Sequence, residues 1–397
     1  MVVAAFLGMA TKYSEGLLAV KYRTVAEDGH SLGGPFYYIE LGMGKNFKWL
    51  AKIFAFFGVC VGLFGIGTFS QVNGISSAVH GFFDPNDAFT VKILPFLGEY
   101  SWSVVIASLI LSFCVAAVLI GGVKRIASVS QIIVPFMAVI YFVFAVILIC
   151  CNITKVPAAF ATIVTAAFSP KAITGGAVGS MLIAMQKGVA RGIFSNEAGL
   201  GSAPIAAAAA QTNSPVRQGL VSMTGTFIDT IIICTLTGLS IVLTGAWQVE
   251  GLEGVQVTTY AFQHGLPFPA QFSSFILMLC LVFFAFTTIL GWDYYSERCL
   301  EYLSGGNMKH VKIFRWIYIL AVFIGPYMTV SAVWTIADIF NGLMAIPNMI
   351  ALFALSGVIV KETRAFFQHA KEEALAEHRS FEEVCEENLN EEEAPAN

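Results

Sequence analysis

The fold of this chain is decided by residues 174–210, which read TGGAVGSMLIAMQKGVARGIFSNEAGLGSAPIAAAAA. Glycine recurs through this apolar stretch, and three polar residues, Ser195, Asn196 and Glu197, stand in its middle. Each glycine lowers helix stability by about 1 kcal/mol relative to alanine, so we expect a helix with an interruption here. Inside a bilayer, an interruption is tolerated only where it is buried or lines a cavity, where freed backbone groups can bind a zwitterion or a cation. The alternative is a cytoplasmic loop over 193–204, and composition alone leaves both interpretations open.

The composition of the whole chain indicates a membrane protein. Of 397 residues, 57% are hydrophobic and 12% are charged, and the mean hydropathy is +0.75. Soluble domains carry about 25% charged residues, and a soluble fold lacks the polar surface to cover so many apolar side chains. The net charge of −4 gives no basic face, so nucleic acid is not expected as a partner. The eight cysteines show no C-x-x-C spacing and the six histidines are scattered singly, so neither a metal site nor a bound cofactor is predicted.

Apolar runs of about 20 residues predict the helices that cross the membrane. The predicted spans are 53–80, 102–121, 130–151, 175–194, 217–246, 271–295, 313–330 and 342–360. The stretch 331–341 is apolar but broken by Asp338, so it either extends a neighbouring span or forms a short helix at the membrane surface. Residues 1–20 begin apolar and then meet Lys12 and Glu15, which is typical of the second half of a longer helix. We therefore expect the chain to begin inside a membrane helix and to have nine spans, the first incomplete.

Basic residues indicate the orientation, because cytoplasmic loops are enriched in lysine and arginine. If the first helix ends in the cytoplasm, all but three of the 22 basic residues lie on the cytoplasmic side, the exceptions being Lys92, Lys155 and Lys171. The segment 21–52 is then a cytoplasmic loop and 363–397 is an acidic cytoplasmic tail. From about residue 372 the tail is so rich in glutamate that we expect it to be solvated and frayed or disordered.

The eleven residues 194–204, FSNEAGLGSAP, look like the signature of the alanine or glycine:cation symporter family. Further matching pieces follow in order between about residues 6 and 364. They are GGPFYYI at 33–39, GGVKRI at 121–126, PVRQG at 215–219, FIDT at 227–230, AFTTILGW at 285–292 and NGLMAIPN at 341–348. A long match with collinear partners is far more specific than a lone glycine motif.

The resemblance implies an all-α polytopic membrane protein with a LeuT-like fold. In that fold, two inverted repeats of five helices surround a central site, and the first helix of each repeat is broken. Residues 53–151 would be the third to fifth helices of the first repeat, after 1–20 as the end of its second helix. Residues 175–362 would be the second repeat, with its broken helix at about 175–204. The first core helix and part of the second would then precede residue 1, so we expect this chain alone to be incomplete and not to transport.

Gln71, Ser195 and Asn196 are the first candidates for contact with a substrate. Gln71 lies in a long apolar span, and its amide can donate to a carboxylate and accept from an ammonium group. By resemblance, the stretch around Gln71 lines the substrate site. The alternative for Gln71 is an interhelical hydrogen bond, typically worth under ~2 kcal/mol in a membrane. Ser195 and Asn196 lie in the expected interruption, where their side chains and backbone could hold an amino acid.

Thr287 and Thr288 are adjacent hydroxyls in an otherwise apolar helix. The resemblance implies that such a pair serves a sodium site, with Thr288 also facing the substrate. The alternative is a bond from each hydroxyl to the preceding helical turn. Trp292, one turn beyond Thr288, is predicted to wall the pocket and limit substrate size, or else to lie at the membrane interface. Asp229 sits inside a span, where a carboxylate is usually paired, and it is a weaker candidate for ion binding.

Three charged residues, Lys187, Arg191 and Glu197, lie close to the expected interruption. They could form an inner gate of salt bridges. They could equally be interfacial side chains that extend to the membrane surface, which is the interpretation we prefer for Arg191.

The function that the resemblance implies is secondary active transport in the cell membrane. A small neutral amino acid such as alanine or glycine would enter together with sodium, the coupling ion, by alternating access. A proton-coupled or other amino-acid carrier of the same fold is one alternative, and an inactive fragment is another. A membrane-embedded enzyme would belong to a different class. Such enzymes tend to show clustered histidines or paired aspartates, and the sequence shows neither, nor a nucleophile–base pair.

Overall fold

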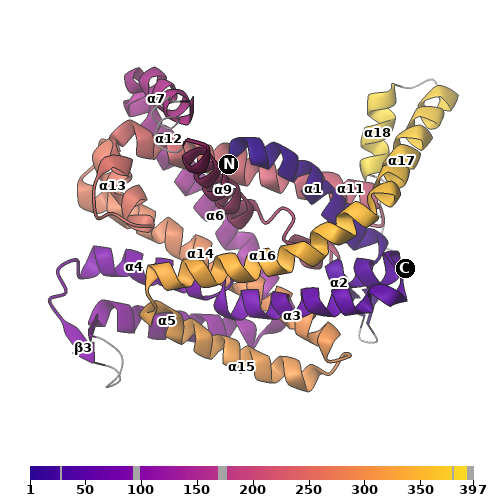
Figure 1. Cartoon of the computed structure of the whole chain (residues 1–397), viewed down its shortest axis with the longest axis horizontal. Helices are drawn as coiled ribbons and strands as arrows, with labels where there is room; N and C mark the ends of the chain where they lie inside the picture. Colours follow the sequence, from indigo (N-terminus) through magenta and orange to yellow (C-terminus); the bar gives the residue numbers. More distant parts are fainter. Residues whose placement is uncertain (27–28, 93–98, 169–176, 378–379, 391–397) are drawn as a thin grey trace.

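The computed structural model describes residues 1–397 apart from 27–28, 93–98, 169–176, 378–379 and 391–397 (Figure 1). Within the described residues, the chain is helical apart from two short antiparallel hairpins and the connecting loops. One hairpin pairs β1 (Thr24–Val25) with β2 (Ser31–Leu32), with Thr24 opposite Leu32. The other pairs β3 (Thr90–Lys92) with β4 (Glu99–Ser101).

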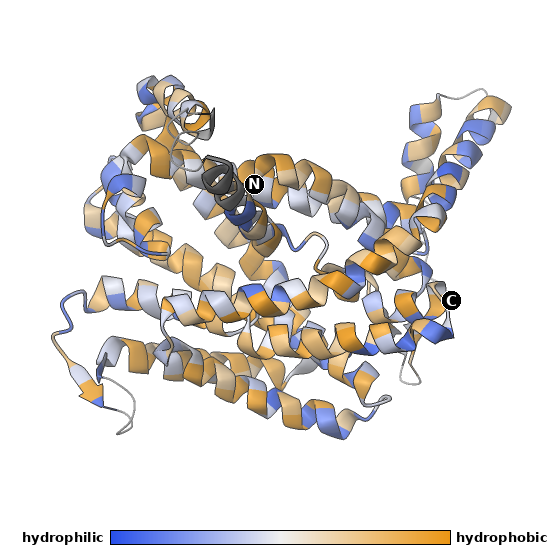
Figure 2. Ribbon diagram, viewed as in Figure 1, coloured by the Kyte–Doolittle hydropathy of each residue, from blue (hydrophilic) through white to orange (hydrophobic). Residues whose placement is uncertain are grey.

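Six helical stretches among the described residues are long and apolar enough to cross a membrane. They are Lys45–Phe83, Trp102–Leu119, Gly122–Cys151, Pro215–Thr244, Ala270–Leu303 and Val330–Ala354. Figure 2 shows hydrophobic residues along the length of the long helices and hydrophilic residues mostly near the ends of the molecule. These helices confirm the predicted class, an all-α polytopic membrane protein.

The first part of the chain builds α1 to α7. The helices are α1 (Val2–Lys21), α2 (Pro35–Tyr37), α3 (Lys48–Phe64), α4 (Phe69–Phe83), α5 (Trp102–Leu119), α6 (Gly122–Cys151) and α7 (Val156–Phe168). The π-helical turn η1 (Tyr38–Gly42) continues α2, and the 3-10 turns η2 (Lys45–Phe47) and η3 (Ile153–Lys155) precede α3 and α7.

The second part builds α9 to α18. The helices are α9 (Ala177–Asn196), α10 (Ala203–Ala207), α11 (Pro215–Thr226), α12 (Thr235–Thr244), α13 (Val255–Gly265), α14 (Ala270–Leu303), α15 (Met308–Ile324), α16 (Val330–Ala354), α17 (Ser356–Glu377) and α18 (Phe381–Asn390). The π-helical segment η4 (Phe227–Cys234) joins α11 to α12 without a break. The 3-10 turns η5 (Ala246–Gln248) and η6 (Gly325–Tyr327) follow α12 and α15.

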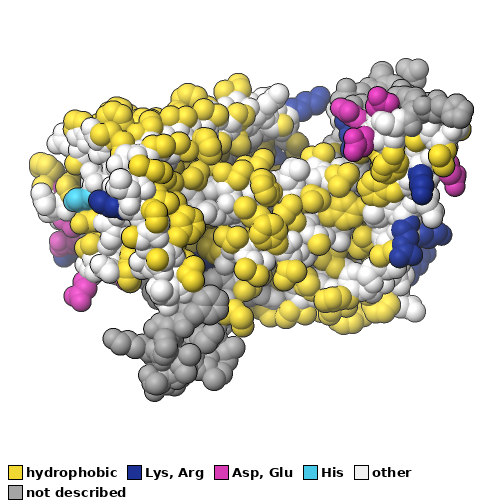
Figure 3. Space-filling view, turned by 90° about the horizontal axis from the view of Figure 1, so that it is seen from above, with side chains coloured by type: hydrophobic (Ala, Val, Ile, Leu, Met, Phe, Trp, Pro, Cys, Tyr) yellow, Lys and Arg dark blue, Asp and Glu magenta, His cyan; other side chains and the backbone are white. Residues whose placement is uncertain are grey.

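The long helices α3, α4, α15 and α16 run along the long axis of the molecule (Figure 1). One end, at the left of the figure, carries the β3 strand together with α7 and α13. The other end, at the right, carries α2 and the α17–α18 pair. Figure 3 shows hydrophobic side chains across the middle and most of the visible Lys and Arg side chains toward the right-hand end. The two ends therefore differ in charge, as expected of a chain with one orientation in a membrane.

Glycines let α3 and α14 approach closely, and we call this contact the α3–α14 seam. Gly58 and Gly62 face α14, and a Cβ at Gly62 would overlap the Ser296 hydroxyl. Trp292, in the middle of α14, is fully buried, and a Cβ at Gly67 would lie 2.7 Å from its Cβ. Small residues at such contacts are typical of membrane helices, whose association depends on close packing. The seam brings the end of α3 directly against the middle of α14.

Several helix boundaries differ from the predicted spans. The predicted single span 53–80 is two helices, α3 and α4, separated by Gly65–Thr68. The stretch 331–341 belongs to α16, which begins at Val330, so it extends the following span rather than forming a separate surface helix. Asp338 does not break this helix because its charge is paired with another side chain, as described below. The segment predicted as the cytoplasmic loop 21–52 contains the β1–β2 hairpin, α2, η1 and the start of α3.

The acidic tail is helical where the structure describes it. α17 continues to Glu377 and α18 covers Phe381–Asn390, so the expectation of a frayed or disordered chain from about residue 372 is wrong for these residues. Ala370 and Ala374 of α17 pack against Val384 of α18 in a small apolar cluster. The prediction failed because it weighed the glutamates and overlooked the apolar residues spaced among them.

Candidate functional site

The glycine-rich stretch contains an unwound segment, Glu197–Ser202, between the end of α9 and the start of α10. We call it the α9–α10 interruption. Gly199 and Gly201 adopt the left-handed backbone conformation, with φ of +87° and +85°, and Glu197 does so at +55°. Few residues other than glycine take this conformation. The segment is buried, with Leu200 1% exposed, so it is not a solvent-exposed loop.

The carboxylate of Glu15, on α1, lies inside the α9–α10 interruption. Glu15 Oε1 accepts hydrogen bonds from the backbone amides of Gly199 and Gly201, each at 3.1 Å. The same oxygen accepts from Asn348 Nδ2, on α16, at 2.7 Å. Glu15 is 0% exposed. An acid from a distant helix thus satisfies the backbone amides that unwinding leaves without helical partners.

Asn348 and Lys12 satisfy carbonyl groups of the same segment. Asn348 Nδ2 also donates to the Gly199 carbonyl at 2.9 Å, and its Oδ1 accepts from the Tyr38 hydroxyl. Lys12, three residues before the acid on α1, donates through Nζ to the Asn196 carbonyl at 2.7 Å. That carbonyl stands at the C-terminal end of α9, where a positive charge is favourable. Side chains of α1 and α16 therefore bond directly to the backbone of the interruption, and Tyr38 of η1 supports Asn348.

Trp292 lies between this segment and the end of α3. Trp292 Nε1 donates to Glu197 Oε1 at 2.9 Å, and Ser202 Oγ donates to Glu197 Oε2 at 2.5 Å. On its other side, Trp292 packs against Gly67 in the α3–α14 seam. The indole is therefore buried at the junction of two unwound segments and does not lie at the membrane interface.

Ser195 and Asn196, both predicted to contact substrate, bond to the π-helical segment η4. Ser195 Oγ donates to Asp229 Oδ2 at 2.7 Å, and Asn196 Nδ2 donates to Thr230 Oγ1 at 2.9 Å. Thr230 Oγ1 in turn donates to Asp229 Oδ2 at 2.8 Å. Hydroxyl and carboxylate oxygens therefore converge at Asp229. Oxygen sets of this kind suit a hard cation, and π-helical turns are frequent at functional sites.

Gln71 lies on α4, just after the second unwound segment, Gly65–Thr68, which we call the α3–α4 interruption. Gln71 Nε2 donates to the Ile66 carbonyl at 3.1 Å, and Thr68 Oγ1 donates to the Leu63 carbonyl at 2.6 Å. These are bonds within one segment, so the interhelical bond considered as an alternative for Gln71 is not what the structure shows. The sequence signal for this interruption was a pair of glycines two residues apart, which the interpretation passed over because the apolar run continues through them.

Thr287 and Thr288 both bond to the preceding turn of α14. Thr287 Oγ1 donates to the Phe283 and Phe284 carbonyls at 3.1 and 3.0 Å, and Thr288 Oγ1 donates to the Phe284 carbonyl at 3.0 Å. Bonds to the preceding helical turn are the arrangement that the sequence analysis gave as the alternative to a sodium site. Because a hydroxyl that donates to a carbonyl keeps its lone pairs, it does not exclude an ion, and the sodium role of this pair stays a prediction.

Arg191 pairs with Asp338 of α16 and not with Glu197. Its Nη2 contacts both carboxylate oxygens, and its guanidinium lies 4.3 Å from the ring centroid of Trp334. No ion pair joins Lys187, Arg191 and Glu197 in the described part of the chain, so the predicted inner gate is wrong. The preferred alternative, an interfacial Arg191, stays a prediction; in the structure the guanidinium is half-buried and paired.

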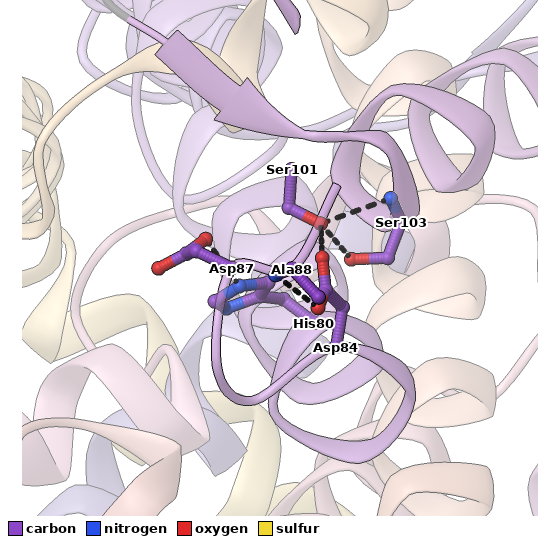
Figure 4. A network of polar contacts seen from close by, with 6 residues as sticks. All are labelled: His80, Asp84, Asp87, Ala88, Ser101 and Ser103. Carbon is purple, nitrogen blue, oxygen red and sulfur yellow. Dashed lines mark hydrogen bonds and ion pairs between the residues drawn. The ribbon is translucent and has the colours of Figure 1, made fainter. Parts of the chain in front are cut away.

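A second polar network lies at the far end of α4 (Figure 4). His80 Nε2 is 3.0 Å from Asp87 Oδ1, and Asp84 accepts from the Ser101 hydroxyl at 2.6 Å and the Ala88 amide at 2.8 Å. The possible ligand atoms of His80, Asp84 and Asp87 lie within 4.8 Å of one another, close enough to hold a metal ion. Each of the three groups, however, already has a hydrogen-bond partner. The bonds from Ser101 and Ala88 lower the pKa of Asp84, and we interpret the network as a link between α4 and α5.

The sequence interpretation missed Glu15, Lys12, Asn348 and Tyr38 as members of the site. It used Lys12 and Glu15 only to mark the end of an apolar run. A signal was available, because an ionisable residue inside a membrane helix indicates a functional site by default. The signal for Asn348 was weaker, an amide after Pro347 in an apolar span, and nothing local distinguishes Tyr38.

Comparisons with known proteins agree with this geometry. The profile of the sodium:alanine symporter family matches residues 1–380. An uncharacterized transporter of Haemophilus influenzae is 53% identical over 372 residues, which cover 94% of this chain and 76% of that protein. The sodium/alanine symporter AgcS of Methanococcus maripaludis is 45% identical over 379 residues, which cover 94% of this chain and 78% of that protein.

Proposed function

We propose that this chain, which belongs to the sodium:alanine symporter family, serves the uptake of a small neutral amino acid such as alanine or glycine together with sodium. That residues 1–397 alone do not transport stays a separate prediction, which uptake by this chain would overturn. The observation that carries the proposal is that two interrupted helices meet at one buried side chain, Trp292. Interrupted membrane helices present backbone and side-chain groups that coordinate ions and zwitterions. The name of the relative AgcS, a sodium/alanine symporter, supports the same substrate and ion.

In this proposal the amino acid lies around Trp292. Ser195 and Asn196 approach it from the end of α9, Gln71 from α4, and Thr288 from α14. Amide and hydroxyl groups can serve both ends of a zwitterion, since an amide donates to a carboxylate and accepts from an ammonium group. The buried indole of Trp292 would wall this site and limit the size of the side chain, which favours alanine and glycine.

Sodium has two candidate positions. One is the Thr287–Thr288 pair implied by the resemblance. The other is the cluster of Asp229, Ser195 and Thr230, which is supported by the two hydroxyl oxygens lying 2.7 and 2.8 Å from Asp229 Oδ2. We expect Asp229→Asn or Thr288→Ala to raise the sodium concentration that gives half-maximal uptake. The variant that does so while leaving the rate at saturating sodium nearly unchanged identifies the ion site.

We further propose the LeuT-like arrangement, with α3–α6 in the first repeat and α9–α16 in the second. The end that carries α2 and α17 would face the cytoplasm, a placement supported by the basic side chains gathered there. Alternating access would then open the junction to each side in turn. The Arg191–Asp338 pair lies between the interruption and the opposite end, where α16 begins, so it would close the outer path.

Uptake measurements test the proposal. The protein is expressed from its gene, purified and reconstituted in lipid vesicles, and uptake of radiolabelled alanine is followed under an inward sodium gradient. We expect uptake that disappears when potassium replaces sodium, and competition by unlabelled glycine. Trp292→Ala should admit larger competitors such as leucine, whereas Trp247→Ala, an exposed tryptophan distant from the junction, should not. Uptake driven by a pH gradient in sodium-free buffer would establish a proton-coupled carrier instead, and no uptake under either gradient would refute the proposal.

A further inference from the structure

Asp293 is a buried acid that the proposed binding of sodium and substrate does not use. It follows Trp292 on α14, is 0% exposed, and neither carboxylate oxygen has a hydrogen-bond partner among the residues that the structure describes. Taking an unpaired carboxylate out of water costs several kcal/mol, so in practice such a group is neutralised. The charge of Asp293 therefore has to be balanced by a species that is not part of the described chain.

Two side chains of α15 that could donate a hydrogen bond to Asp293, Arg315 and Tyr318, have other partners. Glu297, one turn further along α14, forms a two-pronged ion pair with Arg315 of α15, with Nε–Oε1 at 2.7 Å and Nη2–Oε2 at 2.9 Å. The hydroxyl of Tyr318, also on α15, donates to the Ile289 carbonyl at 2.7 Å. The Arg315 guanidinium and the Tyr318 hydroxyl could each donate to the Asp293 carboxylate, but in this conformation each bonds to another group.

The other charges near Asp293 are balanced without it. Arg298 faces Glu301 at 2.6 Å and also contacts His30. The glycines at 58 and 62 are the part of α3 that faces α14, and the lysines of α3 lie at its opposite end. The sequences of α4 and α5 contain no Asp, Glu, Lys or Arg. Of the other helices against α14, α6 carries Lys124 and Arg125 and α13 carries His264, and all three side chains are exposed. With every ion pair neutral, Asp293 leaves one excess negative charge.

A proton suits this position better than a metal ion. Sodium or another hard cation needs several oxygen ligands, and the two arginines of the surrounding ion pairs would repel it. Where Gly62 meets Ser296, three residues after Asp293 on α14, the seam has no space for an added ion, because a Cβ at Gly62 would overlap the Ser296 hydroxyl, which itself bonds to the Gly58 carbonyl at 3.3 Å. A proton needs neither space nor further ligands.

We propose that Asp293 is a proton-binding site. Its carboxylate takes one proton from water and holds it as a neutral carboxylic acid while α14 is packed against α3 and α15 as it is here. When this packing loosens and water enters, the same O–H bond breaks and the proton returns to the solvent, with no change in oxidation state. Because Asp293 directly follows Trp292, we infer that the proton is linked to substrate movement through α14. This linkage rests on the proposed function, whereas proton binding itself does not.

Infrared spectroscopy of the protein in lipid vesicles tests proton binding directly. The spectrum of the wild type minus that of Asp293→Asn should contain the C=O stretching band of a protonated carboxyl at neutral pH, where exposed carboxyls are ionised. Asparagine has the shape of the neutral acid and should fold. The matched control Glu362→Gln removes a carboxylate of α17 that is paired with Lys21 of α1, frees no arginine near Asp293, and should leave the band in place. A difference spectrum without the band refutes the site.

Glu297→Gln tests the charge balance. Removing the acid that holds Arg315 frees its guanidinium to pair with Asp293, so we expect the carboxyl band to disappear even though Asp293 is present. If the band persists in Glu297→Gln, the ion pair does not control the charge of Asp293, and the argument from charge balance is overturned.

Alanine uptake at different pH values tests the linkage. The wild-type rate should fall as the pH rises above the pKa of the site, by up to about tenfold per pH unit. Asp293→Asn is permanently neutral and should lose this dependence. Identical pH profiles for both proteins would refute the linkage between the proton and uptake. Whether Asp293 binds a proton would then be decided by the infrared spectrum alone. Absence of sodium-driven uptake at every pH would refute the proposed function, with no effect on the infrared test.

Discussion

The two interruptions both lie in apolar helices and both contain two glycines, yet their backbone groups find partners in different ways. At the α3–α4 interruption most of the partners are local, and one comes from α15, where the Tyr318 hydroxyl lies 3.2 Å from the Gly67 carbonyl. Thr68, Ser70 and Gln71 all donate to carbonyls between residues 63 and 66. No residue of Gly65–Thr68 has a positive φ.

At the α9–α10 interruption the partners come from elsewhere in the chain. Glu15 of α1 accepts from two amides of the segment, and Asn348 of α16 bonds to one of its carbonyls. Three of its residues take a positive φ. The first interruption therefore depends mainly on hydrogen bonds within its own sequence, with one further bond from α15. The second persists only while α1 and α16 stay in place, so it is the one that a conformational change can remodel.

The largest expected effect comes from Glu15→Ala. The change leaves two buried amides and the charge of Lys12 without their partner, which should destabilise the protein by about 3–5 kcal/mol. Thermal unfolding in detergent measures the effect. Glu15→Gln keeps one acceptor oxygen and should cost less. A Glu15→Ala protein as stable as the wild type would contradict the dependence of the α9–α10 interruption on α1.

Gly201→Ala should have the next largest effect. A left-handed residue with a Cβ costs about 1–2 kcal/mol, and overpacking adds about 1–3 kcal/mol because the Cβ would lie 2.7 Å from Phe54 and from Pro35. Gly245→Ala is the matched control, since its φ of +71° is similar and the space around it is open. Gly74→Ala, in α4 with open space, carries neither cost. Equal unfolding temperatures for the Gly201 and Gly245 variants would show that packing contributes nothing.

Gln71→Ala should destabilise the protein by only about 1 kcal/mol, because it removes one hydrogen bond from a segment that has others. Ser70→Ala is a close control, since Ser70 Oγ bonds to the same Ile66 carbonyl at 3.3 Å. If Gln71 also contacts substrate, its variant should raise the KM for alanine, whereas the Ser70 variant should not. Equal KM values for both would remove Gln71 from the substrate site.

Asp84 belongs to neither interruption and should give the smallest effect. Its folded-state pKa is lowered by bonds from Ser101 and Ala88, so its contribution to stability is fully present above the unfolded value of about 3.9. The contribution is lost as the pH falls from that value through the lowered pKa. We therefore expect the difference in unfolding temperature between wild type and Asp84→Asn to be constant near neutral pH and to shrink in acid. A difference that grows in acid would contradict this sign.

Composition was enough to predict the membrane class, since apolar side chains in this proportion need lipid around them. The glycines and polar residues of 174–210 predicted an interruption near Ser195–Glu197, and α9 ends at Asn196. Local sequence could not show that Glu15 lies inside that interruption, because the contact joins residues 184 positions apart. For the same reason, local sequence could not show that Asn348 belongs to the site, because its partner Glu15 is 333 positions away.

The partners of Arg191 show the same limit. Its guanidinium pairs with Asp338, 147 positions away, and lies over the Trp334 ring, and local sequence indicates neither contact. The proposed place of this pair on the outer path also makes Arg191 an exception to the cytoplasmic placement that the sequence predicted for the basic residues.

Close packing in the α3–α14 seam limits which amino acids can replace the residues that form it. Position 62 has no space for a side-chain carbon because the Ser296 hydroxyl occupies it, and position 67 is limited in the same way by Trp292. A larger residue at 62 becomes acceptable only when residue 296 shrinks to make room. The constraint has a direction: residue 296 can shrink while Gly62 stays, but residue 62 can grow only after residue 296 has shrunk.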